Sequence, residues 1–199
     1  MTNDKEQIVI ATKNLGKVKE LEELLADSPF MLRSLNEFPN APDVEETGAT
    51  FADNAILKAK EYAKQTNIWA LADDSGLEVA ALNGAPGVFS ARYAGENATD
   101  EEKIAKLLSE LEKKDDRRAR FVCAMAMADK TGEIKFLAEG ICNGEIALKS
   151  SGTNGFGYDP IFIPEGFRQS FGELSGEIKR KISHRAQAVT KIIRFLRDF

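Results

Sequence analysis

Two long apolar runs separated by a short turn constrain the fold more than any other feature of this sequence. Residues 119–129 and 133–148 have the composition of strands, and Lys130, Thr131 and Gly132 between them have the composition of a turn. A tight turn joins antiparallel strands. The sequence therefore predicts a hairpin near residue 131, and a sheet that contains this hairpin is not wholly parallel.

The other strand-like segments alternate with amphipathic segments that have a helical period. The predicted strands outside the hairpin are residues 6–12, 31–35 and 68–79, and the predicted helices are residues 14–29, 51–66, 100–114 and 186–199. Thr50 and Thr99 each begin a capping box, which is typical of a helix start. A glycine-rich loop at residues 150–160 leads into a further short strand. This order predicts an α/β protein with helices on the faces of a mixed sheet.

Length, composition and charge exclude several classes of protein. With 199 residues, 43% of them hydrophobic and 30% charged, the chain fits one globular domain over residues 1–199. Its net charge of -5 argues against a nucleic-acid polymer as the main partner, because such binding neutralises phosphates with Lys and Arg. No apolar run approaches the roughly 20 residues that span a bilayer, and residues 1–14 resemble neither a signal nor a transit peptide. We therefore expect a cytoplasmic protein that does not engage a membrane.

The two cysteines carry no sign of a metal or redox site. Cys123 and Cys142 each lie in an apolar strand-like run, without a CxxC neighbour or a metal-ligand spacing. We expect both to be reduced thiols in the core.

Two adjacent acids, Asp73 and Asp74, interrupt a predicted strand that is otherwise apolar. Buried carboxylates need partners, and successive side chains of a strand point to opposite faces. We therefore expect one of these acids to be structural and the other functional. Gly76 marks the end of the strand or a bend, which would place Asp74 and Ser75 near the carboxyl edge where α/β sheets bind ligands. The alternative is a pair of strand-end acids bonded to neighbouring Lys or Arg.

The first strand and helix enclose a possible anion site. Residues 11–18 partly match the phosphate-binding pattern GxxxxGK[ST], but Ala11 and Val18 stand where the first glycine and the Ser or Thr belong. Backbone N–H groups at a helix start still attract anions. Thr12 and Asn14 add side-chain hydrogen bonds, and Lys17 adds a positive charge. The alternative is an ordinary capped helix with surface lysines.

Three acids, Asp43, Glu45 and Glu46, precede the predicted helix at residues 51–66. Mg²⁺ is typically held by one or two carboxylates together with substrate phosphates, so this loop is a candidate metal site. Lys58 within the helix could neutralise either these acids or a phosphate. The alternative is a solvated acidic loop that favours the positive end of the helix.

Two segments in the last quarter of the chain suit recognition of a flat ring. Phe156 and Tyr158 could stack on such a ring, and Asp159 could accept a hydrogen bond from its edge. Residues 179–185 form a donor-rich cluster that includes His184, the single histidine. A turn into a strand, and a structural histidine, are the alternatives.

Several motifs occur together in a consistent order from about residue 7 to the last helix: ATKNLGK, EETGATFADNAILKA, LADDSGLEV, GAPGVFSARYAG, GFGYDPIF and SHR. This set closely resembles the inosine triphosphate pyrophosphatase family, whose members hydrolyse noncanonical purine nucleoside triphosphates, and within it the bacterial dITP/XTP pyrophosphatase branch. Several blocks in order are more specific than any single one.

The resemblance implies a fold, a reaction and a set of site residues. The fold would be an elongated mixed sheet flanked by helices, with two lobes and a central substrate cleft, in a homodimer. The reaction would be Mg²⁺-dependent hydrolysis of dITP, ITP or XTP to the monophosphate and pyrophosphate. Glu46 and Asp74 would hold Mg²⁺, and Asp74 would also accept a proton from the attacking water. The substrate-binding residues would be Thr12, Lys13, Asn14, Leu15, Gly16, Lys17, Ser75, Phe156, Gly157, Tyr158, Asp159, Lys179, His184 and Arg185.

One position departs from the family pattern, and two other functions stay open. The family usually has Glu where Asp53 stands, so no substrate contact is assigned to Asp53. One alternative function is a phosphatase that releases orthophosphate from the γ position. The other is a regulator that binds nucleotides without hydrolysing them.

Overall fold

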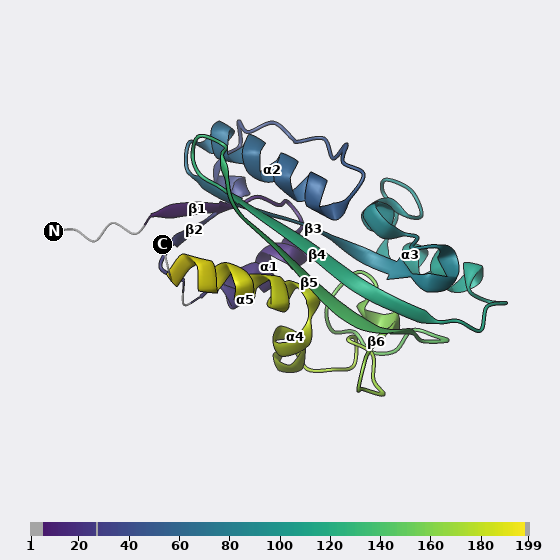
Figure 1. Cartoon of the computed structure of the whole chain (residues 1–199). Coiled ribbons are helices and arrows are strands. Elements are labelled where there is room, and N and C mark those ends of the chain that lie inside the picture. Colours follow the sequence, from purple (N-terminus) through teal and green to yellow (C-terminus); the bar gives the residue numbers. More distant parts are fainter. Residues whose placement is uncertain (1–5, 27, 198–199) are drawn as a thin grey trace. The chain divides into compact units, whose positions relative to one another are not determined.

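Figure 1 shows the computed structural model of the chain, which describes residues 6–26 and 28–197. Within these residues the strands form one six-stranded sheet with the order β2-β1-β3-β4-β5-β6. The strands are β1 (Gln7–Ile10), β2 (Met31–Ser34), β3 (Trp69–Val79), β4 (Arg118–Ala128), β5 (Ile134–Ile146) and β6 (Phe162–Pro164). β1 pairs in parallel with both β2 and β3, whereas β5 and β6 are antiparallel. The sheet is therefore mixed, and the predicted α/β class is confirmed.

The predicted hairpin is present and its turn is well supported by hydrogen bonds. β4 and β5 are neighbours in the sheet. Between them, the Asp129 N–H donates to the Glu133 carbonyl over 3.0 Å, and the Gly132 N–H donates to the Asp129 carbonyl over 2.8 Å. The Asp129 carboxylate also accepts from the Thr131 N–H at 2.9 Å. Gly132 has φ +83°, a left-handed conformation that glycine adopts without strain.

The helices mostly match the predicted segments, with differences at their ends. They are α1 (Leu15–Leu24), α2 (Phe51–Thr66), α3 (Asp100–Glu110), α4 (Gly176–Ile182) and α5 (His184–Arg197), and short 3₁₀ helices cover Leu35–Glu37, Ala80–Leu82, Gly87–Arg92 and Asp159–Ile161. The capping boxes at Thr50 and Thr99 are both formed, and a cap of this kind contributes about 1 kcal/mol. α4 was not predicted, because its seven residues are too few to display a helical period. Of the predicted helical residues, 27, 198 and 199 lie outside the described part of the chain.

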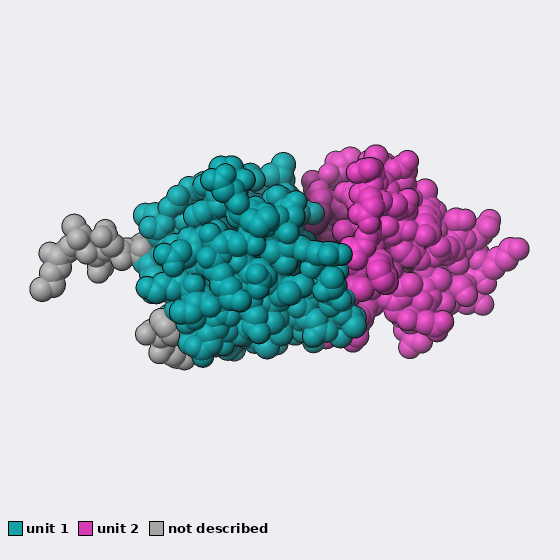
Figure 2. Space-filling view, turned by 90° about the horizontal axis from the view of Figure 1, so that it is seen from above, with its two compact units in different colours: residues 1–74, 123–140, 185–199 teal, residues 75–122, 141–184 magenta. Residues whose placement is uncertain are grey.

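The chain divides into two compact units, coloured teal and magenta in Figure 2. Unit 1 comprises Met1–Asp74, Cys123–Gly140 and Arg185–Phe199, and unit 2 comprises Ser75–Val122 and Ile141–His184. β3, β4 and β5 contribute residues to both units. The single domain, and the two lobes with a cleft that the resemblance implies, stay predictions.

In unit 1, helices lie on both faces of the sheet (Figure 1). On one face, Trp69 and Leu71 of β3 join a cluster with Leu21 of α1 and with Val189 and Ile192 of α5. On the other face α2 contacts β1. The inner side of α2 is a row of small residues, and three of its alanines are fully buried. This row allows the close packing that the sequence predicted; the three are Ala55, Ala59 and Ala63.

Unit 2 has its own core, built around α3 and a group of aromatic rings. Leu107 of α3 packs with Leu77 of β3 and with phenylalanines of β4, β6 and the following loop. The Phe121 and Phe162 ring centroids are 4.5 Å apart, and those of Phe162 and Phe171 are 5.5 Å apart. These contacts hold the loop after β6 against the sheet.

The structure also shows the state of the two cysteines and the character of the helices. Cys123 and Cys142 are both buried and carry free thiols, as predicted. In the described ranges, none of the helices combines the length and apolarity that crossing a membrane requires.

Candidate active site

β3 continues past the two acids instead of ending beside them. Gly76 lies within the strand, so a strand end beside Asp74 and Ser75 is wrong, and both residues lie in the interior of β3. The predicted strand over residues 68–79 is itself confirmed, with its first residue at Trp69. The physical reason is that residues 85–90 supply partners to the last part of the strand. The Leu77 N–H donates to the Ser90 hydroxyl over 2.9 Å, and the Val79 N–H donates to the carbonyl of residue 85 over 3.1 Å.

Asp73 and Asp74 face opposite sides of β3, as strand geometry predicted. The Asp73 carboxylate lies 3.1 Å from the ammonium of Lys17, which belongs to α1. The Asp74 carboxylate accepts from the amide nitrogen of Asn54, on α2, over 3.1 Å. Because the two helices lie on different faces of the sheet, the two acids have different partners.

Asp74, Glu46 and Lys58 form a cluster of charges on the α2 side. Lys58 Nζ lies 2.5 Å from Glu46 Oε1 and 3.6 Å from Asp74 Oδ1. Asn54 links this cluster to the acidic loop, since its side-chain oxygen accepts from the Gly48 N–H over 2.7 Å. The loop that carries Glu46 is therefore held against the helix that carries Lys58.

Burial and neighbouring charges shift the pKa values of Asp74 and Lys58 in this cluster. Burial raises the pKa of Asp74, and the nearby Glu46 carboxylate adds to this, while Lys58 and Lys17 oppose it. Burial alone would lower the pKa of Lys58, but the carboxylates of Asp74, Asp73 and Glu46 raise it above its ordinary value. The cluster thus combines a more basic aspartate with a lysine that keeps its charge.

The donor set of this cluster fits Mg²⁺ once substrate phosphates are present. Among the described residues, no group of three or more His, Cys, Asp or Glu side chains forms a complete metal site. Two carboxylates, Glu46 and Asp74, nevertheless converge on one ammonium. Mg²⁺ is commonly bound by one or two carboxylates with phosphates and water supplying the other oxygens. The pair therefore suits a metal that arrives with its substrate.

The predicted phosphate-binding residues, 12–17, run from the end of β1 into the first turn of α1. Asn14 is the N-cap, and its side-chain oxygen accepts from the Lys17 N–H over 3.1 Å. The Thr12 hydroxyl accepts from the Asn14 N–H over 3.2 Å. Lys13, Asn14 and Leu15 are exposed, and Lys13 forms an ion pair with Asp43 of the acidic loop. This exposed turn presents N–H groups and a lysine, as an anion site requires.

Asp73 and its partners form a buried network on the other face of β3. Besides Lys17, Asp73 accepts from the guanidinium of Arg185 on α5 over 3.1 Å. Arg185 also donates to Glu20 of α1. Both Asp73 and Arg185 are almost completely buried. The sequence left the partner of Asp73 unnamed, and the structure supplies two cations; the predicted substrate contact of Arg185 stays a prediction.

In unit 2, Asp159 organises the predicted ring-binding residues. Its carboxylate accepts from the Phe156 N–H over 2.8 Å and pairs with Lys179 Nζ at 2.5 Å. Lys179 Nζ also lies 4.9 Å from the centre of the Phe156 ring, a cation–π distance. Gly155 has φ +76°, and a Cβ there would lie 2.0 Å from the Asp159 carboxylate. The turn that presents Phe156 therefore requires glycine at position 155.

The remaining predicted residues of this group are held by neighbours within unit 2. The Gly157 N–H donates to Asp100 at the start of α3 over 2.6 Å. The Tyr158 hydroxyl donates to the carbonyl of residue 90 over 3.0 Å. The His184 ring stacks on Phe121, with centroids 4.7 Å apart and an interplanar angle of 12°. Phe156 and Gly157 are half-buried, whereas Tyr158, Asp159 and His184 are buried.

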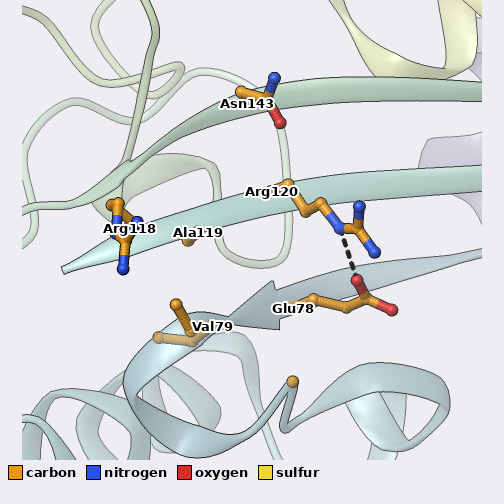
Figure 3. Close-up of a pocket in the computed structure, with 8 residues that line it drawn as sticks. Glu78, Val79, Arg118, Ala119, Arg120 and Asn143 are labelled. Atoms are coloured by element: carbon orange, nitrogen blue, oxygen red, sulfur yellow. Dashed lines mark hydrogen bonds and ion pairs between the residues drawn. The ribbon is translucent and has the colours of Figure 1, made fainter. Parts of the chain in front are cut away.

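Two of the open pockets in the described part of unit 2 bear on the position of the site. Figure 3 shows one of about 350 Å³, where Arg120 of β4 donates to Glu78 of β3 over 2.7 Å and Arg118 and Asn143 lie nearby. None of the predicted site residues lines it, so it is not the candidate active site. The other, of about 490 Å³, includes Phe156 and Gly157 in its lining.

The structure thus gathers the predicted residues into two groups. Residues 12–17, Glu46, Asp74 and Arg185 belong to unit 1, and Ser75, residues 156–159, Lys179 and His184 belong to unit 2. Sequence reasoning missed four residues that form hydrogen bonds with members of these groups: Glu20, Asn54, Ser90 and Asp100. Asn54 alone carried a signal, because it precedes Lys58 by four residues and so shares its helix face.

Comparison with known proteins matches this arrangement to one family. The pattern of the Ham1 family matches residues 8–195. The chain belongs to the Ham1 family. This Ham1 protein is 49% identical to the dITP/XTP pyrophosphatase of Bacillus cereus, over 94% of this chain and 92% of the relative. It is 52% identical to the dITP/XTP pyrophosphatase of Desulforamulus reducens, over 96% and 95% of the two chains.

Solved structures agree with the sequence relatives. The HAM1 protein from Coxiella burnetii superimposes with a TM-score of 0.89 and 46% identity, covering 98% of this chain and all of the other. The Ham1 protein from Staphylococcus aureus gives a TM-score of 0.86 and 47% identity, covering 97% and 99%. The family resemblance seen in the sequence motifs of this Ham1 protein is confirmed.

Proposed function

We propose that this chain hydrolyses the noncanonical purine nucleoside triphosphates dITP, ITP and XTP to the monophosphate and pyrophosphate. Such an enzyme removes deaminated nucleotides from the nucleotide pool. The observation that carries the proposal is the convergence of Asp74 of β3 and Glu46 of the acidic loop on Lys58 of α2. The relatives named dITP/XTP pyrophosphatase, at 49 to 52% identity over nearly the full chain, support it.

The triphosphate chain would bind to unit 1. Residues 12–17, with the ammonium of Lys17 and the N–H groups that do not donate within the turn, would contact the phosphates, as at other helix starts that bind anions. Glu46 and Asp74 would hold Mg²⁺ together with phosphate oxygens. Bound Mg²⁺ would neutralise charge that develops on those oxygens during hydrolysis. Lys58 would keep the two carboxylates close together between turnovers.

Asp74 would accept the proton of the water that attacks between the α- and β-phosphates. Its pKa is raised by burial, which makes its carboxylate a stronger base than an exposed aspartate. The Asn54 amide donates to Asp74 Oδ2, and this hydrogen bond fixes the orientation of the carboxylate. The protein supplies little covalent chemistry here, and the rate would depend on positioning and charge.

The base would be recognised by the group in unit 2. Phe156 offers a half-buried ring for stacking, and Lys179 and Asp159 hold that ring in place. Hypoxanthine and xanthine carry a 6-oxo group that accepts a hydrogen bond where adenine donates one. A donor from His184 or from the backbone of this loop would therefore favour these bases and leave adenine unpaired. Ser75, which follows Asp74 in the chain, would also contact the substrate.

One activity screen tests the proposal. The purified chain is incubated with Mg²⁺ and with ITP, dITP, XTP, ATP or GTP, and phosphate is measured with and without added inorganic pyrophosphatase. We expect ITP, dITP and XTP to yield pyrophosphate, and ATP and GTP to react much more slowly. Release of orthophosphate without pyrophosphatase would overturn the proposal in favour of a γ-phosphatase. Nucleotide binding without turnover would favour a regulator.

Assembly and location are further proposals. The homodimer follows from the family resemblance, and sedimentation velocity on the purified chain would test it. The proposals of a cytoplasmic location and of no membrane or nucleic-acid partner rest on the charge and the apolar pattern of the sequence. Cell fractionation with an antibody would test the location.

A further inference from the structure

Both the backbone N–H and the side-chain ammonium of Lys17 contact other residues of unit 1. Its backbone N–H donates to the side chain of Asn14, the N-cap of α1, over 3.1 Å. Its ammonium lies 3.1 Å from Asp73 Oδ2, beneath the first turn of the helix, and its side chain is 13% exposed. A free lysine side chain samples many rotamers, and this one is confined by a partner that solvent does not reach.

Asp73 does not reach a ligand directly. Its side chain has no exposed surface, and it lies on the face of β3 opposite Asp74 and the proposed metal site. The same Oδ2 atom that contacts Lys17 also accepts from Arg185, whose side chain is 1% exposed. Any effect of Asp73 on the reaction must therefore pass through a neighbouring residue.

Arg185 fixes the place of that carboxylate. It bridges Asp73 of β3 and Glu20 of α1, so that three elements of unit 1, β3, α1 and α5, meet at one guanidinium. A guanidinium binds carboxylates in a fixed planar geometry, unlike a lysine ammonium. Lys17 thus contacts a carboxylate whose position Arg185 fixes.

We propose that Asp73, held by Arg185, is a positioning residue that places the Lys17 ammonium for the substrate's phosphate chain. The ammonium has three N–H donors, so its contact with Asp73 leaves two for phosphate oxygens. Fixing the side chain in advance lowers the cost of ordering it on binding. This inference rests on the proposed function for the nature of the substrate, but the contact itself does not depend on turnover.

The test is a double-mutant cycle between Asp73 and Lys17. The probe is inorganic tripolyphosphate, and its Kd is measured by calorimetry in EDTA, so that neither metal nor turnover enters the readout. Loss of a charge-assisted contact weakens binding about 10- to 100-fold. We expect such a loss for Lys17→Met, a comparable loss for Asp73→Asn, and no additional loss in the double variant. If the losses of the two single variants multiply, Asp73 does not act through Lys17 and the inference is wrong.

A matched control separates positioning from general support of the network. Glu20→Gln removes the other carboxylate of Arg185 but leaves the contact between Asp73 and Lys17 in place. Its tripolyphosphate Kd is expected to stay within about twofold of the parent value. A loss as large as that of Asp73→Asn would show that any damage to the network lowers binding, and would overturn the specific role of Asp73.

A second variant keeps the test decisive if Asp73→Asn does not fold. Asp73→Leu combined with Arg185→Met removes both members of the buried pair, a replacement that proteins often tolerate. It leaves Lys17 without its anchor, so we expect the same loss of tripolyphosphate binding. Binding at the parent level would overturn the inference. Parent protein that binds tripolyphosphate but does not hydrolyse ITP would refute the proposed function while leaving this cycle interpretable.

Discussion

Asp73 and Asp74 are adjacent in β3, yet their carboxylates bind cations from different helices. Asp73 pairs with Lys17 of α1, and Asp74 lies 3.6 Å from Lys58 of α2. The alternation of side chains along a strand makes this possible, because neighbours face opposite sides of the sheet. One strand thereby supports two sites with separate tasks.

Replacing Asp74 by Asn should abolish turnover while leaving substrate binding largely intact. The amide keeps the shape of the side chain but cannot accept a proton from water, so we expect kcat for ITP to fall about 10²- to 10⁴-fold. Steady-state kinetics and calorimetric binding of ITP measure the two effects. Glu78→Gln, an acid-to-amide change on the same strand outside the site, should keep kcat unchanged. A near-normal kcat for Asp74→Asn would refute its role as the base.

Asp73 should make the folded state more stable at neutral pH than in acid. Burial alone would raise its pKa, but Lys17, Arg185 and Lys58 hold it below its ordinary value of 3.8. The unfolded chain therefore binds a proton at higher pH than the folded chain does. This stabilisation is fully present well above pH 3.8 and is lost as the pH falls toward the lowered value.

Urea unfolding at pH 7, 5, 4 and 3 measures this dependence. The free energy of unfolding should fall steeply at the acid end in the parent protein. In Asp73→Asn, which has no carboxyl group at this position, the decrease should be smaller. Parallel curves for the two proteins would show that Asp73 does not contribute to the acid sensitivity.

Asn54 should control how tightly the acidic loop is held near Asp74. It donates to Asp74 and accepts from the Gly48 N–H, and it is buried. Asn54→Ala leaves both partners without this bond, which costs about 1 to 3 kcal/mol of stability. Because Glu46 lies in the same loop, the variant should also need more Mg²⁺ for half-maximal activity. Asn36→Ala, at an exposed position of unit 1, should change neither quantity.

Lys179 should matter for both stability and nucleotide affinity. Its removal in Lys179→Met leaves the buried Asp159 carboxylate without this cation, a change that typically costs about 3 kcal/mol. The Phe156 ring loses its neighbour, so KM for ITP should rise. The control is Lys181→Met on the same helix. The Lys181 side chain is exposed and forms an ion pair with the exposed Glu177, so its replacement should have little effect on stability or KM. Equal effects of the two changes would contradict the role of Lys179.

The local parts of this structure were accessible from the sequence. Apolar alternation and helical spacing predicted most strands and helices, and the turn at residue 131 predicted the mixed sheet. Capping residues marked two helix starts correctly. These signals are local, since each depends on residues a few positions apart. The seven-residue helix α4 was missed, because a short segment shows no period. Whether the strand ends or bends at Gly76 stayed open, because the partners of the last part of β3 come from residues 85–90.

The sequence by itself determined that Asp73 and Asp74 face opposite sides of a strand and that both need partners, because strand periodicity and the cost of burying charge are general. Only the tertiary structure decided which partners they have. Arg185 reaches Asp73 across 112 residues of chain and reaches Glu20 across 165. Such pairs leave no periodic trace in the sequence. They arise because folding buries charges from distant segments together, and a buried charge is stable only beside its opposite.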